Sequence, residues 1–273
     1  MPNINVVIPG FIETAMNEAA AARGTSIESI VNAALGQYFQ TTRHRLYQIS
    51  TAAALVEGVY EGAVSSRILL AHGNFGLGTF EHLDGEMVIL DGNIYQVHGN
   101  GSVELRADDF PVPFAVVSYF EEETTFAANE VGSLSELEQA CDTHRESDNL
   151  FYALRADGVF EQMHTRAMSA TAEGTHLVQA AESQPEFRFN NIEGTLVCIW
   201  SPGYSRAFSV PGYHFHFISK DRTKGGHVLN SSAQTLRIRI QTLCEFDMRL
   251  PGEGSFLKAD LTRDTAADLK KAE

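Results

Sequence analysis

The hydrophobic pattern at the start of the chain predicts one short strand and two helices. Residues 4–9, INVVIP, form a brief apolar stretch of the kind expected in a strand. In the following segment, FIETAMNEAAAARG, apolar residues recur at the spacing of one helix face, and Gly24 is expected to end that helix. Thr25 and Glu28 make a capping-box pattern, from which a second amphipathic helix runs to Tyr38.

This N-terminal segment, residues 1–43, is too short to fold alone. A single strand has no partner inside it, and so short a segment cannot close a core of its own. The simplest partner is a second copy of the same segment. We therefore expect residues 1–43 to form a homodimerisation module. A segment docked on the chain's own larger domain remains the alternative.

After the polar junction TTRHR, the pattern changes to one typical of strands. β-branched and aromatic residues dominate, and turns such as LDGEM, LDGNIYQ and HGNGS divide them. The stretch 133–144, SLSELEQACDTH, predicts a helix that opens on Ser133 with Glu136 in the capping position. The last residues, ADLTRDTAADLKKAE, predict a polar helix. The expected fold class is α+β: a β-rich domain over residues 44–273, preceded by a strand-helix-helix module.

Charge and cysteine usage narrow the functional classes. The 273 residues carry a formal charge of −15, which repels phosphate backbones and anionic lipid heads. The N-terminus lacks a basic, apolar leader, and no run approaches the roughly 18 apolar residues that span a bilayer. Cys141, Cys198 and Cys244 are odd in number and far apart, which argues against a disulfide framework or a thiolate metal site. We expect a cytoplasmic protein with three buried thiols and no membrane partner.

Three of the ten histidines fall within residues 212–227, GYHFHFISKDRTKGGH. On a strand, His214 and His216 share one face, while the aromatic residues between and beside them face the apolar side. A turn at residues 220–223 places His216 opposite His227. Three neutral nitrogen ligands with an open fourth position are typical of a catalytic zinc site. Three satisfied core or surface histidines are the alternative, but the HxH alternation with a register-matched third histidine favours the metal.

Residues 3–40 resemble the ribbon-helix-helix family through INVVIP, ARGTSIESIV and the spacing between them. In this family two chains pair their strands into a ribbon, which many members lay in the DNA major groove. Here the segment holds a single basic residue, Arg23, against Glu13, Glu18 and Glu28. This excess of negative charge disfavours contacts with DNA phosphates. The resemblance therefore implies dimerisation rather than DNA binding, although nucleic acid remains a possible partner of residues 1–40.

A second resemblance covers residues 46–273 and rests on LYQISTAAALVEGVYEG, GLGTFEHLDGEM, DGNIYQ, PVPFAVVSYF, NLFYALRADGVF, TRAM, GTLVCIWSP and GYHFHFISKDRTKGGHVLN. Together these motifs resemble the α-acetolactate decarboxylase family. The resemblance implies a zinc enzyme, usually dimeric, that converts 2-acetolactate to acetoin and carbon dioxide in an α+β fold rich in mixed sheet. It also implies that the histidines of GYHFH and GGH are the zinc ligands.

The same resemblance assigns five further positions. Glu86 in LDGEM would act as metal ligand or acid/base, Thr79 in GLGTF as a substrate contact, and Arg166 in TRAM as the arginine that faces the substrate. Met168 stands where the family often has valine and would form an apolar pocket wall. Glu273 matches a C-terminal glutamate that folds over the site and contacts zinc or transfers a proton. Without the family, Met168 aside, the four polar positions would be a solvated turn glutamate, a strand-edge threonine, a surface ion-pair arginine and a frayed terminus.

The chemistry of the implied substrate agrees with these residue types. Loss of carbon dioxide from a β-keto acid with an adjacent hydroxyl leaves an enediolate, whose charge needs an electron sink such as a tris-histidine zinc. A positioned acid must then protonate it. One alternative is a regulator in which residues 1–40 bind operator DNA and the larger domain senses acetolactate or acetoin. Another is a different metal-dependent lyase or hydrolase with the same histidines.

Overall fold

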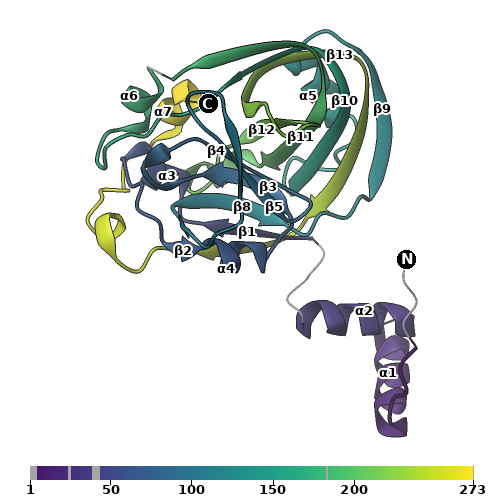
Figure 1. Cartoon of the computed structure of the whole chain (residues 1–273). Coiled ribbons are helices and arrows are strands. Elements are labelled where there is room, and N and C mark those ends of the chain that lie inside the picture. Colours follow the sequence, from purple (N-terminus) through teal and green to yellow (C-terminus); the bar gives the residue numbers. More distant parts are fainter. Residues whose placement is uncertain (1–4, 24–25, 39–43, 183, 273) are drawn as a thin grey trace. The chain divides into compact units, whose positions relative to one another are not determined.

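A computed structural model of the chain describes residues 5–23, 26–38, 44–182 and 184–272 (Figure 1). The chain divides into two compact units, Met1–Thr42 and Arg43–Glu273. Among the described residues, the first unit contains two helices and the second contains all the strands. Within the described residues, no helix is long and apolar enough to cross a membrane.

The N-terminal unit contains the two predicted helices, α1 (Gly10–Arg23) and α2 (Ile27–Tyr38). At the start of α1, the Pro9 carbonyl accepts the backbone amide of Ile12. The predicted strand over 4–9 is not confirmed, because the described residues 5–9 form none. A lone strand has no hydrogen-bonding partner within one copy of this segment. Gly24 and Thr25, the expected helix boundary, lie outside the described residues.

A seven-stranded mixed sheet forms one layer of the second unit. Its strand order is β14-β1-β8-β3-β4-β5-β6, and every neighbouring pair is antiparallel except the parallel pair β14 and β1. The strands are β1 (Arg45–Ile49), β3 (Phe75–Thr79), β4 (Glu86–Leu90), β5 (Asn93–Val97), β6 (Val103–Arg106), β8 (Phe114–Ser118) and β14 (Glu245–Arg249). A separate two-stranded ladder joins β2 (Val64–Ser65) to β7 (Pro111–Val112).

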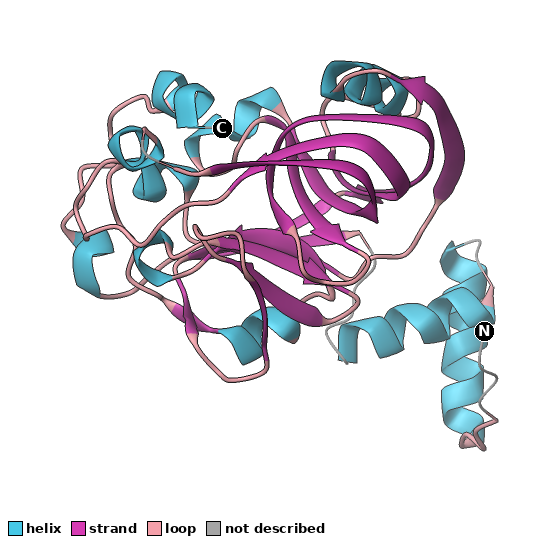
Figure 2. Ribbon diagram, turned by 45° about the horizontal axis from the view of Figure 1, so that its top comes forward, coloured by secondary structure: helices cyan, strands magenta, loops and turns pink. Residues whose placement is uncertain are grey.

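The longer strands form a five-stranded sheet that curls on itself, as Figures 1 and 2 show. Its order is β10-β11-β12-β13-β9, and a further pairing of β10 with β13 closes four of the strands into a ring. All these pairs are antiparallel. The strands are β9 (Thr124–Val131), β10 (Phe151–Arg166), β11 (Glu186–Ser201), β12 (Gly212–Ser219) and β13 (Gly225–Leu243).

Short helices lie around the two sheets (Figure 2). They are α3 (Ala52–Val56), α4 (Ser66–Leu70), α5 (Leu134–Asp142), α6 (Leu177–Ala181), α7 (Ala266–Ala272) and the 3-10 turns η1 (Glu81–Leu83), η2 (Gly203–Ala207) and η3 (Gly254–Leu257). The helix predicted at 133–144 is confirmed as α5, with the Ser133 hydroxyl accepting the Glu136 amide. The Glu136 carboxylate accepts the amide of Gly132, one residue before the cap. The C-terminal helix is shorter than predicted, because residues 259–265 are not α-helical.

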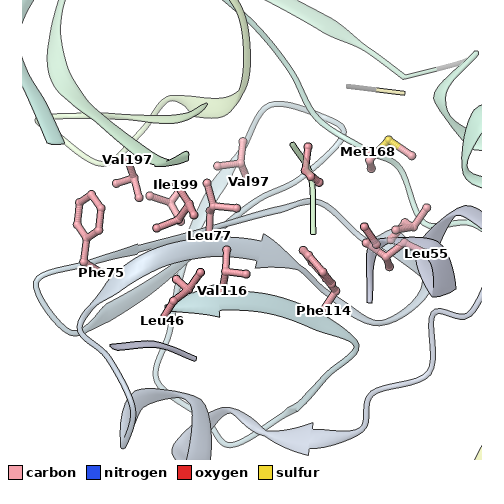
Figure 3. Close-up of a cluster of buried hydrophobic side chains, with 14 of the residues drawn as sticks. Leu46, Leu55, Phe75, Leu77, Val97, Phe114, Val116, Met168, Val197 and Ile199 are labelled. Atoms are coloured by element: carbon pink, nitrogen blue, oxygen red, sulfur yellow. The ribbon is translucent and has the colours of Figure 1, made fainter. Parts of the chain in front are cut away.

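Three apolar clusters hold the second unit together. The first lies between the sheets, where Leu77 and Val116 of the seven-stranded sheet meet Val197 and Ile199 of the five-stranded sheet (Figure 3). The second fills the inside of the curled sheet and includes Phe215 and Phe217, which confirms the predicted apolar face of β12. The third joins the other face of the seven-stranded sheet to α4. The opposite face of β12, which carries the histidines, consequently points toward the space between the sheets.

The three cysteines are free thiols. Cys141 and Cys198 are buried, as predicted, but Cys244 is exposed. The prediction for Cys244 was wrong because this residue occupies the one-residue link between β13 and β14 rather than a strand interior. Burial raises the pKa of the Cys141 thiol to about 12.

Candidate metal centre

The β12–β13 hairpin brings the three histidines together. The Ser219 amide donates to the Lys224 carbonyl at 2.8 Å, which closes the turn predicted at residues 220–223. His216 then lies directly opposite His227, which confirms the predicted register. The ring centroids of His214, His216 and His227 are 4.9 to 5.5 Å apart, and one ligand nitrogen from each lies within 4.8 Å of the others. All three rings are buried.

The glycine before His227 lets β13 approach β10 closely. Gly226 has a φ of +133°, and a Cβ at this position would lie 2.5 Å from the Arg166 carbonyl oxygen. Any larger residue would force the two strands apart. On β10, Arg166 is paired directly with His227. The GGH sequence therefore places the third histidine beside the arginine.

Hydrogen bonding and burial prepare two of the rings to act as metal ligands. The His216 Nδ1 lies 2.8 Å from the Met87 carbonyl oxygen, so it donates there, and Nε2 is the nitrogen left for a metal. Burial, together with the positive charge of Arg166, lowers the pKa of His214 to about 3. A neutral imidazole is the species that binds zinc. The chemistry of this donor set therefore suits a divalent transition metal.

The seven-stranded sheet provides the opposite wall. Thr79 and Glu86 are directly paired across β3 and β4. The Thr79 hydroxyl donates to the Gly85 carbonyl at 3.0 Å. One carboxylate oxygen of Glu86 accepts the Met168 amide at 3.2 Å, and the other lies 3.4 Å from His216 Nε2. Glu86 is thereby a buried carboxylate held against the histidine cluster.

One pocket between the sheets collects these groups. It is lined by Leu55, Gly78, Thr79, Leu83, Glu86, Phe114, Arg166, Met168, Leu177, Gln184, His214, His216 and His227. Leu55, Phe114 and Met168 lie at one end of the apolar cluster in Figure 3, so the pocket continues the interior of the domain. Arg166 is buried. A small molecule in this pocket would meet nitrogen ligands, a guanidinium and a carboxylate within largely apolar walls.

Seven of the eight site residues named from the sequence line this pocket, and Glu273 lies outside the described residues. Sequence reasoning missed the remaining lining residues. The apolar ones, such as Leu55 and Phe114, have the same pattern as ordinary core positions. Gln184 gave no motif signal, although its place just before β11 could have been inferred from the β10–β11 pairing. The Met87 carbonyl could not have been inferred, because strand packing alone brings it to His216.

The sequence matches known proteins over most of its length. A family model described as alpha-acetolactate decarboxylase matches residues 46–263. A protein of that name from Methanosarcina mazei is 39% identical over 254 residues, covering 93% of this chain and 88% of the relative. One from Lactococcus lactis is 37% identical over 218 residues, covering 80% of this chain and 92% of the relative.

Solved structures agree with these matches. The alpha-acetolactate decarboxylase of Bacillus subtilis strain 168 superposes with a TM-score of 0.81 at 32% identity, covering 84% of this chain and 99% of that one. A Staphylococcus aureus protein described as similar to this enzyme gives a TM-score of 0.80 at 31% identity, covering 84% of this chain and 100% of that one. These relatives support the interpretation of the chain as an alpha-acetolactate decarboxylase and give no support to the alternative of a DNA-binding regulator. The chain belongs to the alpha-acetolactate decarboxylase family and is a carboxy-lyase.

Proposed function

We propose that the protein catalyses the zinc-dependent decarboxylation of 2-acetolactate to acetoin and carbon dioxide, as in acetoin and butanediol formation. One observation carries this proposal: three buried histidines, with ligand nitrogens within 4.8 Å of one another, share a pocket with Arg166 and Glu86. Metal, guanidinium and carboxylate are the groups that the removal of a carboxylate and a later proton transfer require.

The proposed zinc ligands are His214, His216 and His227, with Glu86 as a possible fourth. Catalytic zinc sites usually have three or four protein ligands, drawn from histidine, carboxylate and cysteine side chains. No cysteine lines this pocket, so histidine and carboxylate are the ligands available. When bound, zinc would supply Lewis-acid stabilisation for the negative oxygen charge of the enediolate. The hydrogen bond from His216 Nδ1 to Met87 would orient that ring and keep its Nε2 available.

Arg166 is the proposed binding group for the substrate carboxylate. Its guanidinium can donate two parallel hydrogen bonds to a carboxylate, and the same donors can stabilise the charge that spreads over oxygen after carbon dioxide leaves. Arg166 sits beside His227 in the strand register, so the carboxylate and the ketone of one substrate molecule can be held at once. This role explains why the arginine is buried.

Glu86 is the proposed proton-handling group on the other wall. The Met168 amide fixes one of its oxygens and leaves the other directed at the histidines. A carboxyl group held in this way can carry a proton to the enediolate. Glu273 is proposed as a second proton donor or zinc contact. Thr79 and Met168, which both lie next to Glu86, would shape the substrate site.

An acetoin assay on the purified full-length chain tests the function. We expect acetoin to form from 2-acetolactate, to stop when a strong chelator removes the metal, and to return when zinc is added. Removal of the metal should reduce the rate by more than about 100-fold, since several kcal/mol of charge stabilisation are lost. Acetoin formation that is unaffected by complete removal of metal would reject the zinc mechanism. No acetoin under any metal condition would reject the activity.

We also propose that residues 1–43 form a ribbon-helix-helix-like module that joins two copies of the chain, while residues 44–273 form the catalytic domain. The described part of the module exposes large apolar side chains, with Val7 99%, Phe11 75% and Tyr38 80% accessible. Exposed apolar surface of this kind is typical of an interface. The Methanosarcina mazei match leaves at most about 19 residues of this chain unaligned, so it extends into this module.

Deletion of residues 1–43 tests the assembly. We expect the shortened protein to keep kcat/KM for 2-acetolactate within about twofold and to show a smaller assembly by analytical ultracentrifugation. An unchanged assembly would reject the dimerisation role. Salt-sensitive binding of the full-length chain to a specific duplex would instead support DNA binding by this module. The proposed compartment is the cytoplasm, in keeping with three free thiols.

A further inference from the structure

Gln184 occupies a pocket position to which neither the sequence motifs nor the proposed mechanism gives a role. In the β10–β11 register, Arg166 pairs with Glu186. The Ala167 amide donates to the Pro185 carbonyl, so the antiparallel pairing continues one step beyond β11. The next step of this register sets Gln184 opposite Met168, on the side of the strands that carries Arg166. Gln184 and both of those residues line the pocket.

The carboxamide oxygen of Gln184 is buried and has no hydrogen-bond partner among the described residues. A buried amide oxygen without a partner is destabilising, and in a pocket it marks a place where a ligand can donate a hydrogen bond. The oxygens of Gln48 and Gln241 also lack partners. Those two amides, however, are anchored through Nε2 to backbone carbonyls, and neither lines this pocket. Of these three glutamines, Gln184 is the one that lines the pocket.

Few of the other polar side chains that line the pocket can accept a hydrogen bond from a substrate hydroxyl. Arg166 only donates. Glu86 accepts the Met168 amide through one oxygen and directs the other at the proposed metal ligands, so it is one rival acceptor. Thr79 directs its proton to Gly85, so its hydroxyl oxygen is a second rival acceptor. Among the groups of a 2-hydroxy-3-oxo acid, the hydroxyl is the one that donates a proton.

We propose that Gln184 Oε1 accepts a hydrogen bond from the 2-hydroxyl of the substrate, and that it makes the site select 2-hydroxy-3-oxo acids over 3-oxo acids that lack this hydroxyl. The proposal rests on the proposed decarboxylase function and adds a specificity-determining residue to it. A site built to pair a substrate hydroxyl disfavours an analogue without one, because the buried protein group is then left unpaired.

Two stable substrate analogues test this role by calorimetric titration of the zinc-loaded full-length protein. In 2,3-dihydroxy-2-methylbutanoate the ketone is reduced, so no carbon dioxide can be lost, and 3-hydroxy-2-methylbutanoate additionally lacks the 2-hydroxyl. We expect the dihydroxy compound to bind the wild type at least about tenfold more tightly. In Gln184→Met, of similar length but unable to accept the bond, this ratio should fall toward one. Gln184→Glu keeps an acceptor oxygen and should keep the ratio of the two affinities, even if its negative charge lowers the affinity for both analogues.

Controls separate this role from a purely structural one. Gln179→Met changes an exposed glutamine of α6 and should leave both affinities unchanged. A general disturbance of the pocket would weaken both analogues equally and leave their ratio intact, which would overturn the proposal. A ratio near one in the wild type, no binding of the dihydroxy compound, or loss of the ratio in Thr79→Val but not in Gln184→Met would also overturn it. Absence of acetoin formation with a normal ratio would reject the proposed function alone.

Discussion

The two walls of the pocket differ in chemistry and in origin. The five-stranded sheet contributes nitrogen, through His214, His216, His227 and Arg166 on β10, β12 and β13. The seven-stranded sheet contributes oxygen, through Thr79 and Glu86 on β3 and β4. Each wall is held by its own strand register, and the walls meet where His216 contacts the Met87 carbonyl and Glu86.

This division implies that binding the metal and turning over the substrate can be separated by mutation. The histidines can approach one another through the β12–β13 hairpin alone. The carboxylate reaches them only after the two sheets have packed through the apolar cluster between them. Changes at the three histidines should therefore remove metal and activity together, whereas changes at Arg166 or in the opposite wall should spare the metal.

The largest effect is expected for His216→Ala. This change removes a proposed zinc ligand, so bound zinc should be lost and kcat/KM for 2-acetolactate should fall by more than about 100-fold, which exceeds the usual cost of losing a group that only orients a ligand. Metal analysis and circular dichroism would measure the ion and the fold. His144→Ala, a histidine stacked on Phe126 outside the pocket, is the matched control and should keep both zinc and activity. One zinc per chain in His216→Ala would contradict the ligand assignment.

Arg166→Ala is expected to have the second largest effect and to separate substrate turnover from metal binding on the five-stranded sheet. The variant is expected to keep zinc but to lose about 100- to 1000-fold in kcat/KM, the usual cost of removing a donor to developing negative charge. Arg166→Lys retains the charge without the planar fork and should recover only part of the rate. Kinetics like those of the wild type in Arg166→Ala would remove this residue from the mechanism.

Glu86→Gln tests the contribution of the seven-stranded sheet to catalysis. Its side-chain oxygen can still accept the Met168 amide, so the fold should survive. Loss of the carboxylate should lower kcat by about 100-fold through impaired proton transfer, with zinc retained. Glu81→Gln provides the control, since that carboxylate accepts the Gly62 amide and does not line the pocket. Loss of zinc in Glu86→Gln would instead make Glu86 chiefly a metal ligand.

Met168→Val should have the smallest effect and should change only the size of substrate that the pocket accepts. Valine is smaller, so the apolar wall should admit a larger alkyl group. We expect the ratio of kcat/KM for the 2-ethyl homologue of acetolactate to that for acetolactate to rise by up to about tenfold, the range that one methylene allows. A ratio unchanged in Met168→Val would show that this side chain does not limit substrate size.

The sequence made the two walls predictable to different degrees. Strict alternation in YHFHF and the turn length fixed the histidine register from local rules alone. Glu86 stands in a turn-like LDGEM segment, so only the resemblance to a known family singled it out. Its contact with His216 depends on how two sheets pack, which no local pattern encodes. Gln184 lies outside any motif, and its unpaired oxygen becomes evident only in three dimensions.

Outside the pocket, a local helix cap was predictable from the sequence, whereas strand pairing and the exposure of one cysteine were not. The α5 helix was predicted because its Ser133 cap is a local interaction. The strand expected at residues 4–9 needs a partner that one copy of the segment does not contain. Exposure of Cys244 follows from its location in a one-residue link that composition does not reveal.

Anomalous diffraction from crystals of the zinc-loaded protein, recorded on both sides of the zinc absorption edge, would show directly whether the three histidines bind zinc. We expect one zinc ion per chain, bonded to His214, His216 and His227 at about 2.0 to 2.1 Å. Zinc bound at other residues, or a histidine cluster that contains no anomalous scatterer at full zinc occupancy, would contradict it.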